Sequence, residues 1–407
     1  MKYSRRSGAS RRIGLALLAS AALVVAGCGG SDGSEGASPG ADTSIDINTA
    51  VPEEIRAAAE AAEAKGLRFV TSREELMKQA EEEASLFGYM QLSTDEQPKI
   101  LTDMFHDEYP FAEDLELADL SGNQPRSRLQ AEIEAGQARD VDIVPVEQEA
   151  YAQWLPYVKS WDIYGMAEAG ILDIPLEMID PQSRTVVAFN SSTAAVLYNK
   201  DLIAEEDVPD DWFGFLDPRF SRDNLGMVVN LEATNEVLMV PTWGIDRTLE
   251  YARGIAAQNP IWTDSQRRGL QLVQQGEAAV FPMTHAHAAT RTIAAAKEAG
   301  EDNVGMKIIE PTPLRSTRGT GITEWSEHPH VALLWLEFVA SDAVQKALNE
   351  TDPPVSSYYS TWEDPSSLKS FIGDREVAPV GFEDFPKLAE WLEKIQEAWG
   401  FPTAESG

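Results

Sequence analysis

Two histidines separated by a single residue, His285 and His287, are the side chains of this sequence best suited to contact a ligand. They follow an apolar segment typical of a strand and precede an alanine-rich segment typical of a helix. Side chains two residues apart on an extended segment lie on the same face, so the two imidazoles could share a metal ion such as zinc. The alternative is that one histidine caps the following helix while the other is exposed or binds an anionic ligand, since spacing assigns no further metal ligands. The sequence leaves both interpretations open.

Three loops are expected at the carboxyl ends of strands, where helix N-termini present backbone N–H groups. These groups and the helix dipole favour an anion, so we predict a ligand with a carboxylate, phosphonate or phosphate group, or a metal carried with such an anion. For any single loop, the alternative is a helix that satisfies its own N–H groups. The predicted ligand-binding residues are Tyr89 and Met90 in the first loop, Ser121, Gly122 and Asn123 in the second, and Thr284, His285 and His287 in the third.

The elements that position these loops follow an alternating pattern, which predicts an α/β architecture. The βαβ units of the first half predict a parallel sheet. Thr71 and Glu74 have the spacing of a capping box at the start of a helix. Strands at residues 185–189 and 194–199, separated by a short polar stretch, are the expected crossover into a second lobe. Lobe 1 is predicted from residues 51–190 and 308–407, and lobe 2 from residues 191–307.

Residues 1–27 have the pattern of an export signal. Five basic residues lie within residues 1–12, and residues 13–26 are apolar or small. This run is about half as long as a membrane-spanning helix. It ends at Cys28 in a segment that resembles the lipobox of bacterial lipoproteins, so we expect cleavage before Cys28 and lipid attachment to its thiol. Arg11-Arg12 also resembles part of a twin-arginine signal, and both export routes remain open.

Composition limits the remaining possibilities. Residues 28–50 are rich in Gly, Ser, Asp and Pro and are expected to form a flexible tether. Cys28 is the only cysteine, which excludes disulfides and thiolate metal clusters. Loss of residues 1–27 would leave 28 basic and 67 acidic residues, a net charge of −39. Such a charge argues against a nucleic acid partner, because nucleic acid binding requires a basic surface.

Several segments, taken together in their order along the chain, have a recognisable arrangement. They are Arg128–Gly136 followed by Val141–Val144, Val196–Leu202, Val208-Pro209 with Trp212, Leu216–Arg219, Gly276–Val280, and His328-Pro329 before Leu333–Leu336. This arrangement resembles the ferric-iron-type branch of the extracellular solute-binding proteins of bacterial ABC transporters. The resemblance implies a type 2 periplasmic binding fold, with two lobes joined by two crossover strands around a ligand cleft that closes by hinge motion. It also implies an ABC permease as partner, a monomer without a cofactor, and anchoring through Cys28 at the outer face of the cell membrane.

Ferric-binding members of this branch carry paired tyrosines at the place where this sequence has His285 and His287. The pair Tyr358-Tyr359 lies some seventy residues later and is interpreted as packing. The phenolate ligands that favour ferric iron are therefore not expected here. A secreted metal-dependent enzyme is an alternative, but the sequence has no nucleophile elbow, His-Glu-x-x-His helix, phosphate loop or dinucleotide fingerprint. A lipoprotein that presents its ligand to a sensor would share the fold, so transport and sensing both remain open.

Overall fold

Three short parallel strands begin the sheet, as the βαβ pattern predicts. Strand β1 (Ser85–Met90) pairs with β2 (Asp114–Asp119) on one side and with β3 (Ile143–Pro145) on the other. The connection from β1 to β2 contains α3 (Gln97–Glu108), and the connection from β2 to β3 contains α4 (Asn123–Glu134). The computed structural model describes residues 51–120, 123–138, 140–146, 148–158, 160–231 and 235–401, so the predicted signal peptide (1–27), Cys28, the tether (28–50), Ser121 and Gly122 lie outside the described residues.

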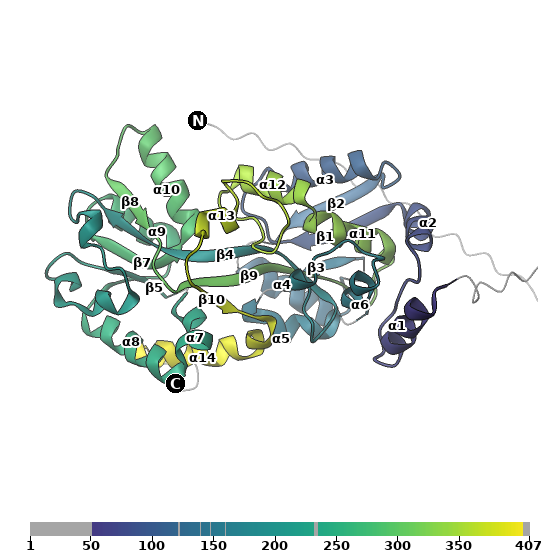
Figure 1. Ribbon diagram of the computed structural model, residues 1–407, viewed down its shortest axis with the longest axis horizontal. Coiled ribbons are helices and arrows are strands. Elements are labelled where there is room, and N and C mark those ends of the chain that lie inside the picture. The colour runs from purple at the N-terminus through teal and green to yellow at the C-terminus, as the bar shows by residue number, and fades with distance from the viewer. Residues whose placement is uncertain are drawn as a thin grey trace, which may run out of the picture. The chain divides into compact units, whose positions relative to one another are not determined.

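Two long strands, β4 (Val186–Asn199) and β9 (Thr312–Ile322), run antiparallel through the centre of the sheet. Because β9 is also antiparallel to β3, the sheet is mixed rather than parallel throughout, which corrects the prediction. The last residues of β4 pair with β7 (Val280–His285) and β8 (Val304–Lys307). The strand order is β2-β1-β3-β9-β4-β7, so β4 and β9 connect the β1–β3 region with the β7–β8 region (Figure 1).

The polar stretch that was predicted to separate two strands instead continues β4 without interruption. All fourteen residues of β4 are buried. The polar side chains find partners there, since the Asn190 amide donates to the Val355 carbonyl oxygen and the Thr193 hydroxyl donates to the Pro313 carbonyl oxygen. A buried polar group is tolerated when it is hydrogen-bonded. The predicted lobe boundary between residues 190 and 191 therefore lies inside a strand, and the lobe boundaries stay a prediction.

The region beyond β4 contains a second, two-stranded parallel sheet of β5 (Val228–Asn230) and β6 (Ile261–Thr263). The α-helices between β5 and β8 in the chain are α7 (Val240–Trp243), α8 (Ile245–Ala257), α9 (Gln266–Gln274) and α10 (Ala286–Glu298). Helix α10 follows β7 directly, with His285 at its N-cap position.

After β9 the chain first returns to the β1–β3 region. Helix α11 (Pro329–Ala340) is almost entirely buried and packs against α2 (Arg73–Glu83). The N-cap of α2 is Ser72, whose side chain accepts from the Glu75 N–H, so the predicted capping box at Thr71 and Glu74 is wrong by one residue. The remaining helices are α1 (Glu53–Glu63), α5 (Tyr151–Trp154), α6 (Ile163–Glu168), α12 (Asp342–Thr351) and α13 (Leu368–Ile372). The last strand, β10 (Val377–Val380), pairs in parallel with the first residues of β9.

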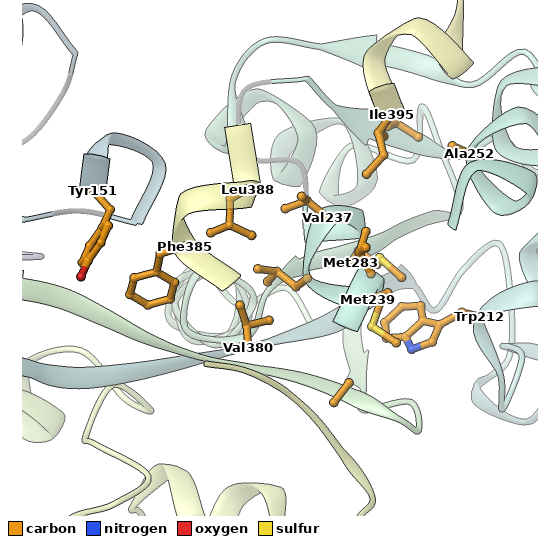
Figure 2. Packing of buried hydrophobic residues seen from close by; sticks show 14 of the residues in the cluster. Tyr151, Trp212, Val237, Met239, Ala252, Met283, Val380, Phe385, Leu388 and Ile395 are labelled. Atoms are coloured by element: carbon orange, nitrogen blue, oxygen red, sulfur yellow. The ribbon is translucent and has the colours of Figure 1, made fainter. Parts of the chain in front are cut away.

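The last helix, α14 (Phe385–Trp399), packs against α8 at one end and approaches α5 at the other (Figure 1). Its buried residues Phe385, Leu388 and Ile395 belong to a core cluster that also contains Tyr151 and Ala252 (Figure 2). This helix is therefore held on both sides by apolar contacts. No helix in the described part of the chain has the length and hydropathy to cross a bilayer.

Candidate functional site

A cavity of about 470 Å³ is lined by the loop after β1, the middle of β4 and β9, the start of α10 and one face of α14. A volume of this size is typical of sites for small ligands. Three arginines line it: Arg126 from α4 and Arg315 and Arg318 from β9. His285 and His287 also line it. Among the described lining residues there is no aspartate, glutamate, tyrosine or cysteine.

A bulge in β7 sets the direction of the histidine segment. The pairing of β7 with β4 shifts by one residue between Ala195 and Leu197, and Met283 in β7 has a positive φ of 52°. Bulges add one unpaired residue to a strand and change the direction of the side chains that follow. The side-chain amide of Asn235 donates to the Met283 carbonyl oxygen at 2.6 Å and lies 3.5 Å from Nδ1 of His285. The bulge and Asn235 together position His285.

The imidazole rings of His285 and His287 are stacked, with centroids 5.4 Å apart and an angle of 16° between their planes. The two residues do not share an extended segment as predicted, because His285 ends β7 and His287 lies in the first turn of α10. His285 occupies the N-cap position, but its side chain makes no capping hydrogen bond, so the alternative of a capping role for His285 is wrong.

Burial and nearby arginines keep both imidazoles neutral. Burial is the largest cause that lowers the pKa of His287 to about 3, followed by the positive charges of Arg291, Arg318 and Arg315. Burial likewise places the pKa of His285 well below its usual value, followed by Arg315, His287 and Arg291. Both side chains are half-buried and remain accessible from the cavity. A neutral imidazole offers one N–H donor and one acceptor to a ligand.

The arginines of β9 are oriented by the polar stretch of β4. Nε of Arg315 donates to the Ser192 hydroxyl at 3.1 Å, and these two residues are cross-strand partners. Arg318 has a positive φ of 58°, and its guanidinium donates to Oδ1 of Asn190 at 3.1 Å and to the Ser93 hydroxyl. A non-glycine residue with a positive φ costs conformational energy and persists only where its surroundings hold it in place. The two guanidinium groups are therefore held in defined orientations beside the cavity.

The predicted site residues separate into two groups. His285 and His287 line the cavity. Met90 is fully buried in the core, and Thr284 is buried where its hydroxyl accepts from the Gln266 amide, so neither lines the cavity. Tyr89 points elsewhere and packs against Phe87, whereas its neighbour Gln91 does line the cavity. Ser121 and Gly122 lie outside the described residues, and for Asn123 only the backbone, at the start of α4, is described.

Several cavity residues were not predicted. Arg126, Arg315 and Arg318 lack a sequence pattern that separates them from surface arginines. The polar stretch inside β4 was a usable signal, because Asn190, Ser191 and Ser192 interrupt an apolar strand and all line the cavity. The contribution of α14 comes from residues more than a hundred positions after His285, and no local pattern indicates that contact.

The remaining histidine pair and the tyrosine pair lie outside the cavity lining. At the start of α11, Nδ1 of His328 lies 3.0 Å from the Asp142 carboxylate and Nδ1 of His330 lies 2.6 Å from the Glu83 carboxylate. Tyr358 packs against a small apolar cluster. Among the described residues no group of three or more His, Cys, Asp or Glu side chains could hold a metal ion.

Comparison with known proteins agrees with this architecture. The sequence profile of the bacterial extracellular solute-binding proteins matches residues 114–360. Curated protein sequences give no match. In solved structures, the fold is similar to that of apo ferric ion-binding protein A from Pasteurella haemolytica, with a TM-score of 0.61 and 13% identity over 79% of this chain and 99% of that one. The fold is also similar to that of Trichodesmium FutA in complex with iron and citrate ligands, with a TM-score of 0.59 and 16% identity over 78% of this chain and 100% of that one.

A third similar structure is the substrate-binding protein of an ABC transporter from Agrobacterium tumefaciens, with a TM-score of 0.57 and 16% identity over 77% of this chain and 95% of that one. At these identities the structures show a shared two-lobed fold. The family profile covers more than half of the chain. The chain therefore belongs to the bacterial extracellular solute-binding proteins, which capture small ligands outside the cytoplasm.

Proposed function

We propose that this protein is the lipid-anchored substrate-binding component of an ABC importer and that it captures a small anionic solute. The main evidence that the ligand is an anion is the cavity lined by Arg126, Arg315 and Arg318, in a chain whose net charge is −34. Guanidinium groups form strong, charge-assisted hydrogen bonds with carboxylate and phosphate groups. Because the protein as a whole is acidic, a cavity lined by three arginines provides the local positive charge that an anionic ligand needs.

The two histidines support the same conclusion. Three nearby arginines disfavour a cation beside the imidazoles, because like charges repel strongly in a partly buried site. A bound anion would instead interact favourably with the arginines and accept a hydrogen bond from an imidazole N–H. Ferric iron is a poor fit, since the described lining offers none of the carboxylate or phenolate oxygens that a hard cation prefers.

A metal bound together with an anion is the second candidate. The specific observation in its favour is the stacked, neutral histidine pair, because metal ions bind the neutral form of imidazole. Such a complex would place the anion against the arginines and the metal against the two imidazoles.

The remaining elements of the proposal rest on the sequence. Residues 1–27 would direct export, Cys28 would carry the lipid, and residues 28–50 would give the folded domain reach above the membrane. A monomer would meet an ABC permease directly. A ligand-presenting sensor would have the same architecture, and uptake assays on a strain that lacks this protein would separate transport from sensing.

The first test is native mass spectrometry of the mature protein, purified from its source without added ligand, with metal analysis of the same sample. An anionic solute of a few hundred daltons or less, without metal, is the expected result. A stoichiometric metal lost on His285→Ala or His287→Ala would instead support the metal-containing alternative.

A matched pair of variants on α4 tests the role of charge. Arg126 lines the cavity, whereas Arg128 is 81% exposed in its side chain and pairs with Glu132. Arg126→Gln should weaken binding of the identified solute by about tenfold or more, because hydrogen bonds to charged groups contribute roughly 1.5–3 kcal/mol. Arg128→Gln should leave binding unchanged. Equal effects of the two variants would contradict the assigned site.

A further inference from the structure

One wall of the cavity is apolar and chemically distinct from the arginine wall. Leu388, Ala389 and Leu392 of α14 line it, and Leu388 and Leu392 lie one helical turn apart on the same face. Val237 and Leu238 of the 3₁₀ helix Asn235–Met239 also line it. The cavity therefore has a basic part formed by β9 and an apolar part formed by α14 and this short helix.

The apolar wall is firmly held. Leu388 packs in the same cluster as Val237, Met239 and Val380 (Figure 2). Helix α14 also contacts α8 and the Asn235–Met239 helix. Side chains that are packed in this way keep a fixed position, so the apolar wall is part of the shape that a ligand meets.

The size of the cavity exceeds what an inorganic oxyanion fills. A tetrahedral ion occupies a small part of about 470 Å³, and the rest would be water against leucine and valine side chains. Water in contact with apolar surface is displaced favourably by an apolar group of a ligand. The ligand that matches both walls is an anion attached to an organic body.

We propose that the solute is an organic anion with an apolar body, whose carboxylate, phosphonate or phosphate group contacts Arg315 and Arg318 while its carbon framework contacts Leu392 on α14. This inference rests on the proposed capture of an anion and adds the chemical class of the ligand. It assigns α14 as a specificity element and Leu392 as the residue that distinguishes organic from inorganic anions. Leu392 is half-buried, so a polar replacement should be tolerated by the fold.

The test uses two series of anions that share a head group and differ in the apolar body. Inorganic phosphate, methylphosphonate and phenylphosphonate form one series, and acetate and benzoate form the other. Binding is measured by isothermal titration calorimetry on the chain from residue 48 onward, which begins where the compact unit Asn48–Gly407 starts. We expect affinity to increase with the apolar body in at least one series, by roughly tenfold from the smallest to the largest member.

Two variants test the contributions of the apolar wall and the arginine wall separately. Leu392→Asn should remove most of that gain and leave the smallest anion within about twofold of its original affinity. Arg315→Gln should weaken the binding of every anion in both series. The control is Leu202→Asn, at an exposed leucine outside the cavity, which should change nothing.

The possible failures are distinguishable. If the smallest and largest anions bind equally, or if Leu392→Asn weakens all members equally, the inference about α14 is overturned while anion capture stands. If no anion in either series binds, both the inference and the proposed anion capture are overturned.

Discussion

The chain contains two His-x-His segments that precede helices, and their surroundings are opposite in charge. His285 and His287 stand before and within the first turn of α10, beside arginines. His328 and His330 stand at the start of α11, and each binds a carboxylate, Asp142 and Glu83 respectively. The same sequence pattern therefore forms a ligand-accessible neutral pair in one place and a carboxylate-bound structural pair in the other. The groups contributed by distant segments decide the role.

Replacement of Asp142 should have the largest effect on stability, because its carboxylate binds His328 of the structural pair. Its carboxylate is 1% exposed and accepts from the backbone N–H groups of Phe87 and His328, the Ser326 hydroxyl, and Nδ1 of His328. Asp142→Ala should lower the free energy of unfolding by about 3–5 kcal/mol, since several buried donors lose their acceptor. Urea denaturation measures this change. Asp140→Ala, at an exposed carboxylate on the same loop, should cost less than about 0.5 kcal/mol.

Glu83 makes a weaker version of the same contact. Its carboxylate accepts from the backbone N–H groups of His330 and Val331 and binds Nδ1 of His330, so it caps α11 from another helix. We expect Glu83→Ala to lower the free energy of unfolding by about 2 kcal/mol without altering ligand affinity. The exposed neighbour Glu82 provides the control variant. A loss of ligand binding in Glu83→Ala at unchanged stability would contradict the division of roles between the two histidine pairs.

Replacement of His285 and His287, which line the cavity, should affect ligand binding more than stability. His285→Ala combined with His287→Ala should weaken binding of the co-purified solute by about tenfold, the size of one lost hydrogen bond to a charged group. Stability should change by less than about 1 kcal/mol, because among the described residues no buried charged group depends on either imidazole for a hydrogen bond. Calorimetric titration and urea denaturation on one preparation separate the two effects. Unchanged binding would remove the histidines from the assigned site.

Much of the fold could be predicted because helices and strands have local patterns. The βαβ units of the first half, for example, predicted the parallel pairing of β1 with β2 and β3. The continuous strand β4 was missed because its polar residues read as a loop, and their partners, such as Val355 for Asn190, come from far along the chain. The bulge at Met283 depends on a register shift that no local pattern indicates.

The candidate site could be predicted only in part for the same reason. His285 and His287 were identifiable because histidines are rare in this chain and lie between a strand and a helix. Arg315 and Arg318 were not, since an arginine shows no local sign of whether it faces solvent or a cavity. The charge that controls the histidines therefore had to come from the three-dimensional arrangement.

The last prediction concerns pH dependence, and it tests the electrostatic difference between the two histidine pairs directly. In the unfolded chain the pKa of histidine is about 6.5. In the folded protein the pKa of His287 is about 3, and that of His285 is well below its usual value. Below pH 6.5 the unfolded state therefore binds protons that the native state does not. The free energy of unfolding should fall as the pH falls from about 6.5 towards 3, and this contribution should be constant above that window.

Comparison with the double variant His285→Gln, His287→Gln isolates this contribution, because all other titrating groups are common to both proteins. Between pH 7 and 5 the wild-type protein should lose more stability than the variant, and the NMR signals of both rings should stay at their neutral positions. The charged groups beside the rings are Arg315, Arg318 and Arg291, of which Arg291 pairs with the buried Asp352 at 3.0 Å. Titration of either ring near pH 6.5 would contradict the neutral pair. Saturation with the anionic solute should raise the pKa of both rings, because a negative charge beside an imidazole favours its protonated form.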